Sequence, residues 1–218
     1  MIRLTKGDEP IVLRDHREAW EQALRDHATN GTEATKSELG KYNHPEIKEA
    51  LLVETAEKCA YCESKLRHIT YGDIEHIVPK KLGLEHRFKW ENLTIGCDVC
   101  NTKKGIKEDL IDPYVDDPDQ EFLLIGPMVL ANPESDRAKI TESALQLNRK
   151  ALLERRAERL NELHKLLQIA LLMPQEAHRQ VLFDQLRNVE TADDVEYAAI
   201  CRSYIRELEA RGILPPAS

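Results

Sequence analysis

The chain has 218 residues, a formal net charge of −8 and 41% hydrophobic residues. This length can bury the core of one domain or of two small ones, and the composition is ordinary for a soluble globular protein. The longest uninterrupted apolar run, Ile169 to Met173, is far shorter than the roughly 20 residues of a membrane-spanning helix. The first residues also lack the apolar core of a signal peptide. We therefore expect a cytoplasmic protein that does not enter a membrane.

The N-terminal part is expected to form two helices. Residues 1–13 resemble an extended arm, and a helix is predicted from Asp15 to about His27 because apolar residues recur there with helical spacing. Residues 28–43 lack such periodicity and are predicted to be a loop. Pro45 suits the first turn of a second helix that ends near Lys58.

The central part is expected to form two short strands and a helix. The predicted elements are a β-rich segment over 69–78, a loop to about 89, a return strand over 93–96 and a short helix over 100–107. Pro79 cannot continue a strand ladder, so it ends the first strand. Gly105 is expected to end or kink the helix.

Residues 108–140 are predicted to be an irregular connecting arm with one strand over 122–125. Four prolines interrupt this arm, which is longer than most loops of compact domains. From Glu108 to Asp136 there are nine acidic residues and no lysine or arginine. An acidic run of this kind is usually a solvated loop.

From Thr141 the sequence becomes helical, and Pro174 is expected to end the first long helix. One apolar stripe follows that helix: Leu153, Ala157, Leu160, His164, Leu167 and Leu171. The stripe either faces a core, which would make His164 a buried core histidine, or docks onto another subunit. Two further helices are predicted over 175–188 and 191–211, and Cys201 is expected to be an inert buried thiol.

Four of the five cysteines form two close pairs. Cys59 and Cys62 make one Cys-x-x-Cys pair, and Cys97 and Cys100 make the other. An odd number of cysteines in a cytosolic chain argues against a disulfide framework. Four thiolates in two pairs predict a tetrahedral zinc site, which is closed and structural because it leaves no open coordination position. A redox role is less favoured, since a thioredoxin-like motif needs only one pair.

The segment from Cys59 to Lys107 carries residue types suited to phosphodiester hydrolysis. His76 is a candidate general base, because its unperturbed pKa lies near neutrality. Glu75 and Asn101 offer oxygen ligands for Mg²⁺ or Mn²⁺. Adjacent residues of a regular strand point to opposite faces, so Glu75 and His76 share a site only if the strand twists or bulges. Otherwise Asp73 or a water takes the place of Glu75.

Charge supports a small nucleic-acid site in this segment. From Cys59 to Lys107 there are nine basic and six acidic residues, although the whole chain is acidic. Lys80 and Lys104 are the candidates for phosphate contacts. Asn101 is expected at a helix N-terminus, which attracts phosphate.

The motifs of this segment resemble the zinc-containing HNH endonucleases. The matching motifs are Cys59-x-x-Cys62, Asp73-x-Glu75-His76-Ile77-x-Pro79-Lys80, Trp90-x-Asn92-Leu93 and Cys97-x-x-Cys100-Asn101-x-Lys103-Lys104-Gly105. The resemblance implies a ββα-metal fold, with His76 as general base, Asn92 fixing the loop that orients it and Asn101 as a metal ligand. Glu75 stands where that family most often has Asp. Asn at the third position is a common variant that favours Mg²⁺-type catalysis.

Looser motifs outside this segment resemble one subfamily. They are Met1 to Gly7, Tyr42-x-His44-Pro45-x-Ile47-Lys48, Asp112-Pro113-Tyr114 and Leu145-x-Leu147-Asn148-Arg149. The subfamily comprises the HNH nucleases of Septu-type anti-phage systems, called PtuB, which also occur beside some retrons. Its members work with an ABC/SMC-like ATPase partner, PtuA.

The sequence thus predicts an α+β fold that is mostly α, with a small ββα-metal module flanked by N-terminal helices and a C-terminal helical region. The expected divisions are an N-terminal part (1–58), the HNH module (59–107), the acidic arm (108–140) and a helical part for core packing or partner docking (141–218). The favoured function is that of a metal-dependent endonuclease with structural Zn²⁺ and catalytic Mg²⁺ or Mn²⁺, which hydrolyses phosphodiester bonds of nucleic acid, with DNA as the expected substrate. The resemblance makes it the effector of a Septu-like anti-phage system that acts with an ATPase partner. The alternatives are the same nuclease acting on RNA such as tRNA, and a zinc-pinned adaptor without catalysis.

Overall fold

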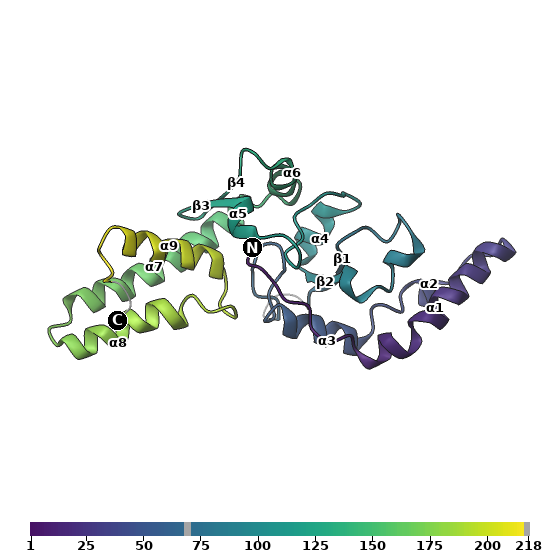
Figure 1. The fold of residues 1–218 in the computed structure, drawn as a ribbon, viewed down its shortest axis with the longest axis horizontal. Helices are drawn as coiled ribbons and strands as arrows, with labels where there is room; N and C mark the ends of the chain where they lie inside the picture. The colour runs from purple at the N-terminus through teal and green to yellow at the C-terminus, as the bar shows by residue number, and fades with distance from the viewer. Residues whose placement is uncertain (68–70, 216–218) are drawn as a thin grey trace.

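The computed structural model describes residues 1–67 and 71–215, and it is a mostly helical α+β structure, as predicted. The chain forms an arch with the longest N-terminal helix at one end, a helical group at the other and the two-stranded module between them (Figure 1). The helices are α1 (Ile11–Asn30), α2 (Lys36–Leu39), α3 (Pro45–Glu54), α4 (Asp98–Lys104), α5 (Pro118–Glu121), α6 (Asp136–Leu145), α7 (Lys150–Leu172), α8 (Glu176–Asp184) and α9 (Ala198–Ala210). The strands are β1 (Asp73–His76), β2 (Leu93–Gly96), β3 (Phe122–Ile125) and β4 (Met128–Ala131). No helix of the described ranges combines the length and the apolarity needed to cross a membrane.

The central module is an antiparallel hairpin followed by a short helix. Strand β1 pairs with β2 so that Asp73 faces Gly96 and His76 faces Leu93. Between the strands lie two short 3₁₀ turns, η1 (Leu84–His86) and η2 (Trp90–Asn92). The strand predicted over 93–96 is confirmed, whereas α4 begins two residues earlier than the predicted helix, because Cys97 accepts a hydrogen bond from Cys100 N and caps it.

The N-terminal helices differ from the prediction at their ends. Helix α1 begins at Ile11, directly after Pro10 and four residues before the predicted start at Asp15, so the end of the predicted extended arm is helical and Ile11 is exposed. It runs to Asn30 because Gly31 adopts the left-handed conformation that ends a helix. Helix α3 begins at Pro45 as predicted but ends at Glu54, four residues before Lys58.

A short helix lies where a loop was predicted over 28–43. The side chain of Thr35 accepts a hydrogen bond from Glu38 N, and the Glu38 carboxylate accepts one from Thr35 N. This capping box stabilises α2 although its four residues show no apolar periodicity.

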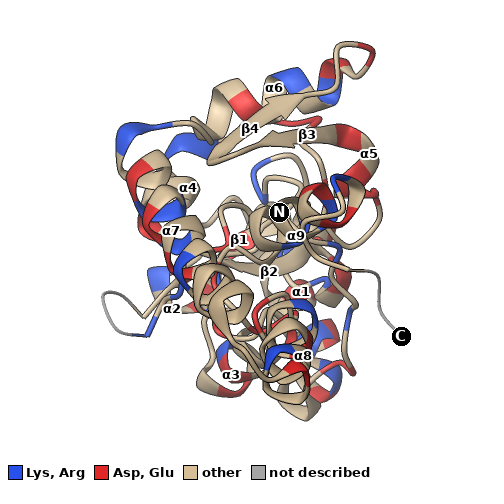
Figure 2. Cartoon of the chain, turned by 90° about the vertical axis from the view of Figure 1, so that its left-hand side faces the viewer, with Lys and Arg blue, Asp and Glu red and all other residues tan. Residues whose placement is uncertain are grey.

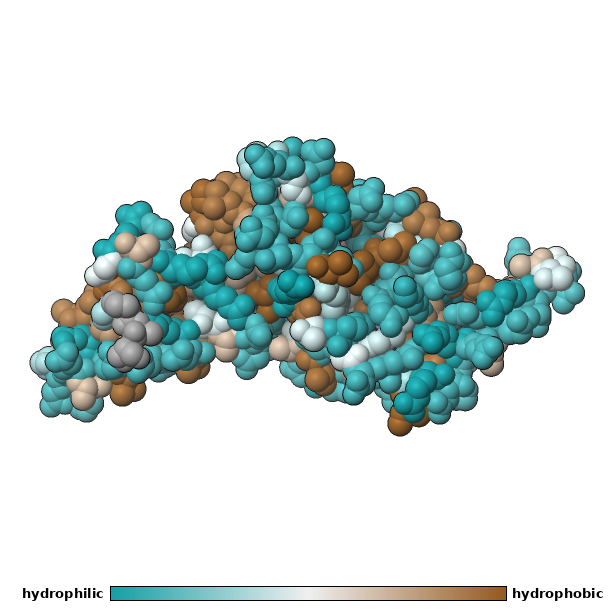
Figure 3. Space-filling view, in the orientation of Figure 1, coloured by the Kyte–Doolittle hydropathy of each residue, from teal (hydrophilic) through white to brown (hydrophobic). Residues whose placement is uncertain are grey.

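Residues 108–140 contain more structure than the sequence predicts. Strand β3 is confirmed, and it pairs with β4, which the sequence does not indicate. Helix α6 begins at Asp136, five residues before the expected start, because Ser135 caps it by accepting a hydrogen bond from Ala138 N. The red ribbon of α5 in Figure 2 marks its acidic residues, Asp119 and Glu121. The apolar surface over β3 and β4 in Figure 3 includes the exposed side chains of Leu123, Ile125 and Met128.

Helix α7 joins two apolar cores and buries a face other than the predicted stripe. Its buried side chains are Leu152, Arg156, Leu163, Leu167 and Ala170, so only Leu167 of the predicted stripe is buried. Leucines occur on several sides of this helix, so periodicity alone does not select the packed face. His164 is exposed, with Nδ1 3.1 Å from the hydroxyl of Tyr204, and is not a core histidine.

The two cores separate along α7. The central core contains side chains from α1 and α3, from the strand module and from Leu152 at the start of α7. The second core contains Leu163 and Leu167 of α7, packed against α8 and α9. Cys201 is buried in this second core, as predicted, where burial raises the pKa of its thiol. A π-helical turn (Gln185–Val189) follows α8, where the sequence predicts a continuous helix to 188.

Candidate active site

The four paired cysteines meet in one buried cluster. The Sγ atoms of Cys59, Cys62, Cys97 and Cys100 all lie within 4.8 Å of one another. Hydrogen bonds from Cys100 and Cys59 hold the pKa of the Cys62 thiol well below its usual range. Thiolates packed so closely repel each other unless a cation neutralises them, and four sulfurs with no open side suit a tetrahedral Zn²⁺. The cluster is therefore capable of binding zinc. It joins the segment Cys59–Cys62, the first knuckle, to helix α4, and this position makes it a structural centre.

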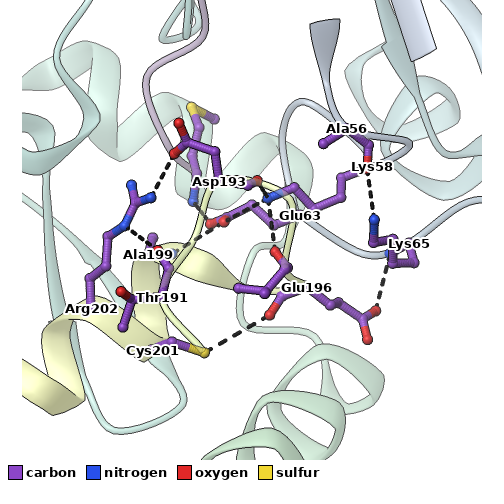
Figure 4. Close-up of polar contacts among 12 residues, drawn as sticks. Ala56, Lys58, Glu63, Lys65, Thr191, Asp193, Glu196, Ala199, Cys201 and Arg202 are labelled. Carbon is purple, nitrogen blue, oxygen red and sulfur yellow. Dashed lines mark hydrogen bonds and ion pairs between the residues drawn. The ribbon is translucent and has the colours of Figure 1, made fainter. Parts of the chain in front are cut away.

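The first knuckle is fastened to the C-terminal region (Figure 4). Glu63, directly after Cys62, forms an ion pair with the Met1 amino group at 2.6 Å and accepts a hydrogen bond from Ala199 N at the start of α9. Lys58, directly before Cys59, donates to the carbonyl oxygens of Asp193 at 2.5 Å and Val195 at 2.9 Å. The knuckle is thus held by residues from the N-terminus and from the segment around the start of α9.

A pocket of about 430 Å³ lies along β1. Its lining residues are Tyr42, Asn43, Asp73, Ile74, Glu75, His76, Pro79, Lys80, Lys81, Asn101, Gly105 and Ile106. All four residues of β1 are among them, so the pocket runs along the edge of this strand that faces away from β2 rather than along one face. Glu75 and His76 therefore border the same pocket without a bulge, because the register with β2 is regular.

His76 is buried and held in one tautomer. The residue is only 4% exposed, and Nε2 lies 2.9 Å from the carbonyl oxygen of Arg87. A carbonyl only accepts hydrogen bonds, so Nε2 carries the proton and Nδ1 of the neutral ring is the basic atom. Burial lowers the pKa of His76 to about 4, and the charge of Lys80 acts in the same direction. The ring is therefore neutral at pH 7 and able to accept a proton.

Glu75 and Lys104 form a buried ion pair beside the pocket. The ammonium nitrogen of Lys104 lies 2.9 Å from Glu75 Oε1 and donates to the His76 carbonyl oxygen at 2.7 Å. Burial raises the pKa of Glu75, and the charge of Lys104 opposes this shift. The Lys104 side chain is 0% exposed and does not line the pocket, so the structure does not bring it to the position of a phosphate contact.

Asn92 holds together the loop between β1 and β2 through side-chain hydrogen bonds. Its Oδ1 accepts from Val78 N at 2.7 Å, and its Nδ2 donates to the carbonyl oxygens of Val78 at 2.9 Å and His86 at 2.8 Å. It does not line the pocket. These three bonds hold the two ends of the loop together, next to the carbonyl of Arg87 that fixes His76.

Asn101 lies at the pocket with Asp73. Its Nδ2 donates to Asp73 Oδ2 at 3.2 Å, and Oδ1 has no hydrogen-bond partner among the described residues. Because α4 begins at Asp98, Asn101 lies one turn inside the helix rather than at its N-terminus. Two carboxylates and one amide oxygen thus border the pocket near His76, a donor set that suits a hard divalent cation.

Outer sequence motifs converge behind β2. Lys6 donates to the Leu93 carbonyl oxygen at 2.6 Å and pairs with Glu54 at 3.1 Å. Tyr114 contacts the same carboxylate and the hydroxyl of Thr94, at 3.0 Å each. These motifs therefore support β2, the strand that pairs with the site strand β1, without entering the pocket. Tyr42 of the Tyr-x-His-Pro motif is the exception, since it lines the pocket, although the sequence assigns it no role.

The hairpin, the short helix, the four-cysteine cluster and the His–Asn–Asn set define a zinc-type HNH module. The family model for HNH endonuclease matches residues 59–107, the span that the sequence predicts. The chain is also similar to the Septu protein PtuB of Bacillus thuringiensis, with 34% identity over 153 residues that cover 68% of this chain and 55% of the relative. A second Septu protein PtuB, from Bacillus mycoides (strain KBAB4), is 25% identical over 196 residues, covering 72% of this chain and 66% of the relative. The chain therefore carries an HNH endonuclease module and resembles PtuB, while spanning just over half to about two thirds of the length of these relatives.

Proposed function

We propose that the chain is a metal-dependent endonuclease in which His76 activates the attacking water. The observation that carries this proposal is the state of His76: a buried, neutral imidazole whose Nε2–H is fixed on the Arg87 carbonyl, beside oxygen ligands in one pocket. Nδ1 removes a proton from water, and the resulting hydroxide attacks phosphorus while the bond to the leaving oxygen breaks. The HNH resemblance implies products with 5′-phosphate and 3′-hydroxyl ends.

A divalent cation, Mg²⁺ or Mn²⁺, would be held by Glu75 and Asn101, with Asp73 beside Asn101 as a further oxygen ligand. The unpartnered Oδ1 of Asn101 at the pocket fits this assignment. When bound, the cation supplies positive charge that stabilises the developing charge on the phosphate. We propose that Lys104, enclosed behind the pocket, holds Glu75 ionised and in place, and that Lys80 at the pocket contacts phosphate.

The relatives supply the biological setting of the proposal. Because they are Septu proteins, we propose that this chain is the nuclease of a Septu-like anti-phage system, in the cytoplasm, together with an ABC/SMC-like ATPase of the PtuA type. The acidic chain, with its small basic window, fits a nuclease that gains nucleic-acid affinity from a partner. The proposal includes the case in which such a nuclease is encoded beside a retron.

A nicking assay tests the activity. Supercoiled plasmid DNA is incubated with the chain in Mg²⁺ or in EDTA, with and without the ATPase partner, and a structured RNA is offered in parallel. Conversion of plasmid to the nicked form in Mg²⁺ but not in EDTA supports the proposal. Cleavage of RNA in place of DNA would change the substrate. Absence of cleavage in every condition would leave a zinc-pinned adaptor instead.

A further inference from the structure

Tyr42 lies outside the matched module yet packs against the proposed general base. It belongs to the turn between α2 and α3, and its ring centroid is 4.6 Å from that of His76 with the two planes at 82°. The imidazole is thus fixed at Nε2 by the Arg87 carbonyl and at its ring by Tyr42. A rotated imidazole would lose both contacts, so Tyr42 restricts His76 to the orientation described here.

The hydroxyl of Tyr42 is paired with Lys80. An ammonium group only donates, so the phenol oxygen accepts from Lys80 Nζ and keeps its own O–H proton as a donor. In the described ranges the hydroxyl has no other hydrogen-bond partner. Lys80 Nζ also lies 4.3 Å from the centroid of the Tyr42 ring, a cation–π arrangement. Both side chains line the pocket, so one O–H and the remaining N–H donors are available to a ligand there.

The turn that carries Tyr42 is anchored at two points. The Thr35–Glu38 capping box holds α2, and Arg87 donates to the Leu39 carbonyl oxygen at 2.8 Å. Arg87 therefore links the α2 turn to His76, since its own carbonyl accepts from the imidazole. The turn between α2 and α3 therefore forms one side of the pocket, although it lies outside the matched HNH residues 59–107.

We propose that Tyr42 is a positioning and substrate-binding residue of this site: its ring orients His76, and its hydroxyl, together with Lys80, binds a non-bridging phosphate oxygen of the nucleic acid. The proposal deepens the proposed nuclease function and rests on it. Two donors on one anionic oxygen, one of them charged, suit a phosphodiester better than a neutral group. The ring and the hydroxyl have separate tasks, so separate substitutions resolve them.

The experiment measures steady-state cleavage of a labelled DNA duplex in Mg²⁺ by the full chain and by Tyr42→Phe, Tyr42→Ala and Tyr71→Phe. Tyr71 is a matched control because it is 83% exposed and does not line the pocket. Tyr42→Phe is expected to raise KM about fivefold to tenfold and to change kcat by less than about twofold, because it removes one hydrogen bond to bound phosphate. Tyr42→Ala is expected to lower kcat about tenfold or more in addition, because His76 loses its packing. Tyr71→Phe should behave as the wild type.

Binding of the same duplex without added Mg²⁺ and without a chelator, followed by fluorescence anisotropy, separates this proposal from the proposed function. Weaker binding by Tyr42→Phe than by the wild type supports the phosphate contact. Equal binding, or cleavage by both Tyr42 variants at the rate of Tyr71→Phe, overturns the proposal while the nuclease function stands. A wild type that does not cleave the duplex contradicts the nuclease function, and the comparison of dissociation constants then decides the phosphate contact alone. Tyr42→Phe keeps the ring, so it tests the hydroxyl even if Tyr42→Ala is destabilised.

Discussion

At the residue scale, neighbouring side chains of one sequence motif have different environments and different roles in the structure. Consecutive lysines of α4 illustrate this: Lys103 is partly exposed, whereas Lys104 is enclosed with Glu75. The residue types needed for hydrolysis were predictable from the sequence, because few side chains act as bases or hard-metal ligands. The burial of Lys104 was not predictable, because a lysine is expected at the surface until its partner, Glu75 on β1, is known.

The ion pair of Lys104 predicts a strong dependence of stability on this residue. Lys104→Met should lower the free energy of unfolding by about 3 kcal/mol or more, because it leaves the Glu75 carboxylate buried without its counter-charge. Lys103→Met should change it by less than about 0.5 kcal/mol, as expected for a peripheral substitution. Urea denaturation measures both. A Lys104→Met/Glu75→Gln double variant should recover part of the loss, and no recovery would argue against the pair.

Asn92 predicts a second stability effect with a functional consequence. Asn92→Ala should cost about 2 kcal/mol, because it removes the partners of one backbone N–H and two carbonyl groups that are partly buried. The loop that presents the Arg87 carbonyl to His76 should then loosen and cleavage should fall. Asn161→Ala on the exposed side of α7 is the control. Unchanged stability of Asn92→Ala would contradict the role of this side chain in closing the loop.

At the element scale, strands that end at or next to a glycine were predictable from the sequence, whereas the short helix α2 was not. Strands β2 and β3 have the predicted bounds, because β-rich segments there end at glycine. Helix α2 depends on a side-chain capping box, and β4 depends on pairing with β3, so neither has an apolar period of its own. The buried face of α7 depends on two different cores and on Arg156, which donates to the Leu147 carbonyl oxygen at 2.8 Å.

The cysteine cluster predicts that the module depends on zinc. The cluster joins the knuckle before β1 to the first turn of α4, so removing the metal should separate these elements. We expect one zinc per chain by elemental analysis and a fall in melting temperature on treatment with a strong chelator. Cys201→Ser should bind zinc as the wild type does. Full zinc content in Cys97→Ser would contradict the assignment of the cluster.

At the scale of the whole molecule, the first knuckle connects the chain's beginning, its centre and its C-terminal helices. Glu63 makes these connections through the Met1 amino group, Lys58 and the N-terminus of α9 (Figure 4). The composition indicated separate regions but not this junction, because Glu63 and its partner Ala199 lie 136 residues apart in sequence. Long-range ion pairs leave no local pattern to recognise.

Glu63 predicts a pH dependence of stability. Burial by itself raises its pKa, but the charges of the Met1 amino group and Lys58 outweigh this and hold the pKa below its usual range. A carboxyl whose pKa is lowered on folding stabilises the protein above its unfolded pKa of about 4.3, and this contribution is lost as the pH falls. Glu63→Gln should therefore cost about 3 kcal/mol at pH 7. The difference from the wild type, followed by urea denaturation, should shrink below about pH 4. A difference that is independent of pH would contradict the pairing.

The central claim is that His76 is the base of a nuclease, and plasmid nicking by His76→Ala tests it most directly. His178→Ala, at an exposed histidine of α8, is the matched control, and zinc content and melting temperature verify that both variants are folded. We predict that His76→Ala loses nicking by about a hundredfold or more in Mg²⁺ while keeping its zinc, and that His178→Ala nicks as the wild type does. Nicking by a folded, zinc-containing His76→Ala at the wild-type rate would contradict the claim.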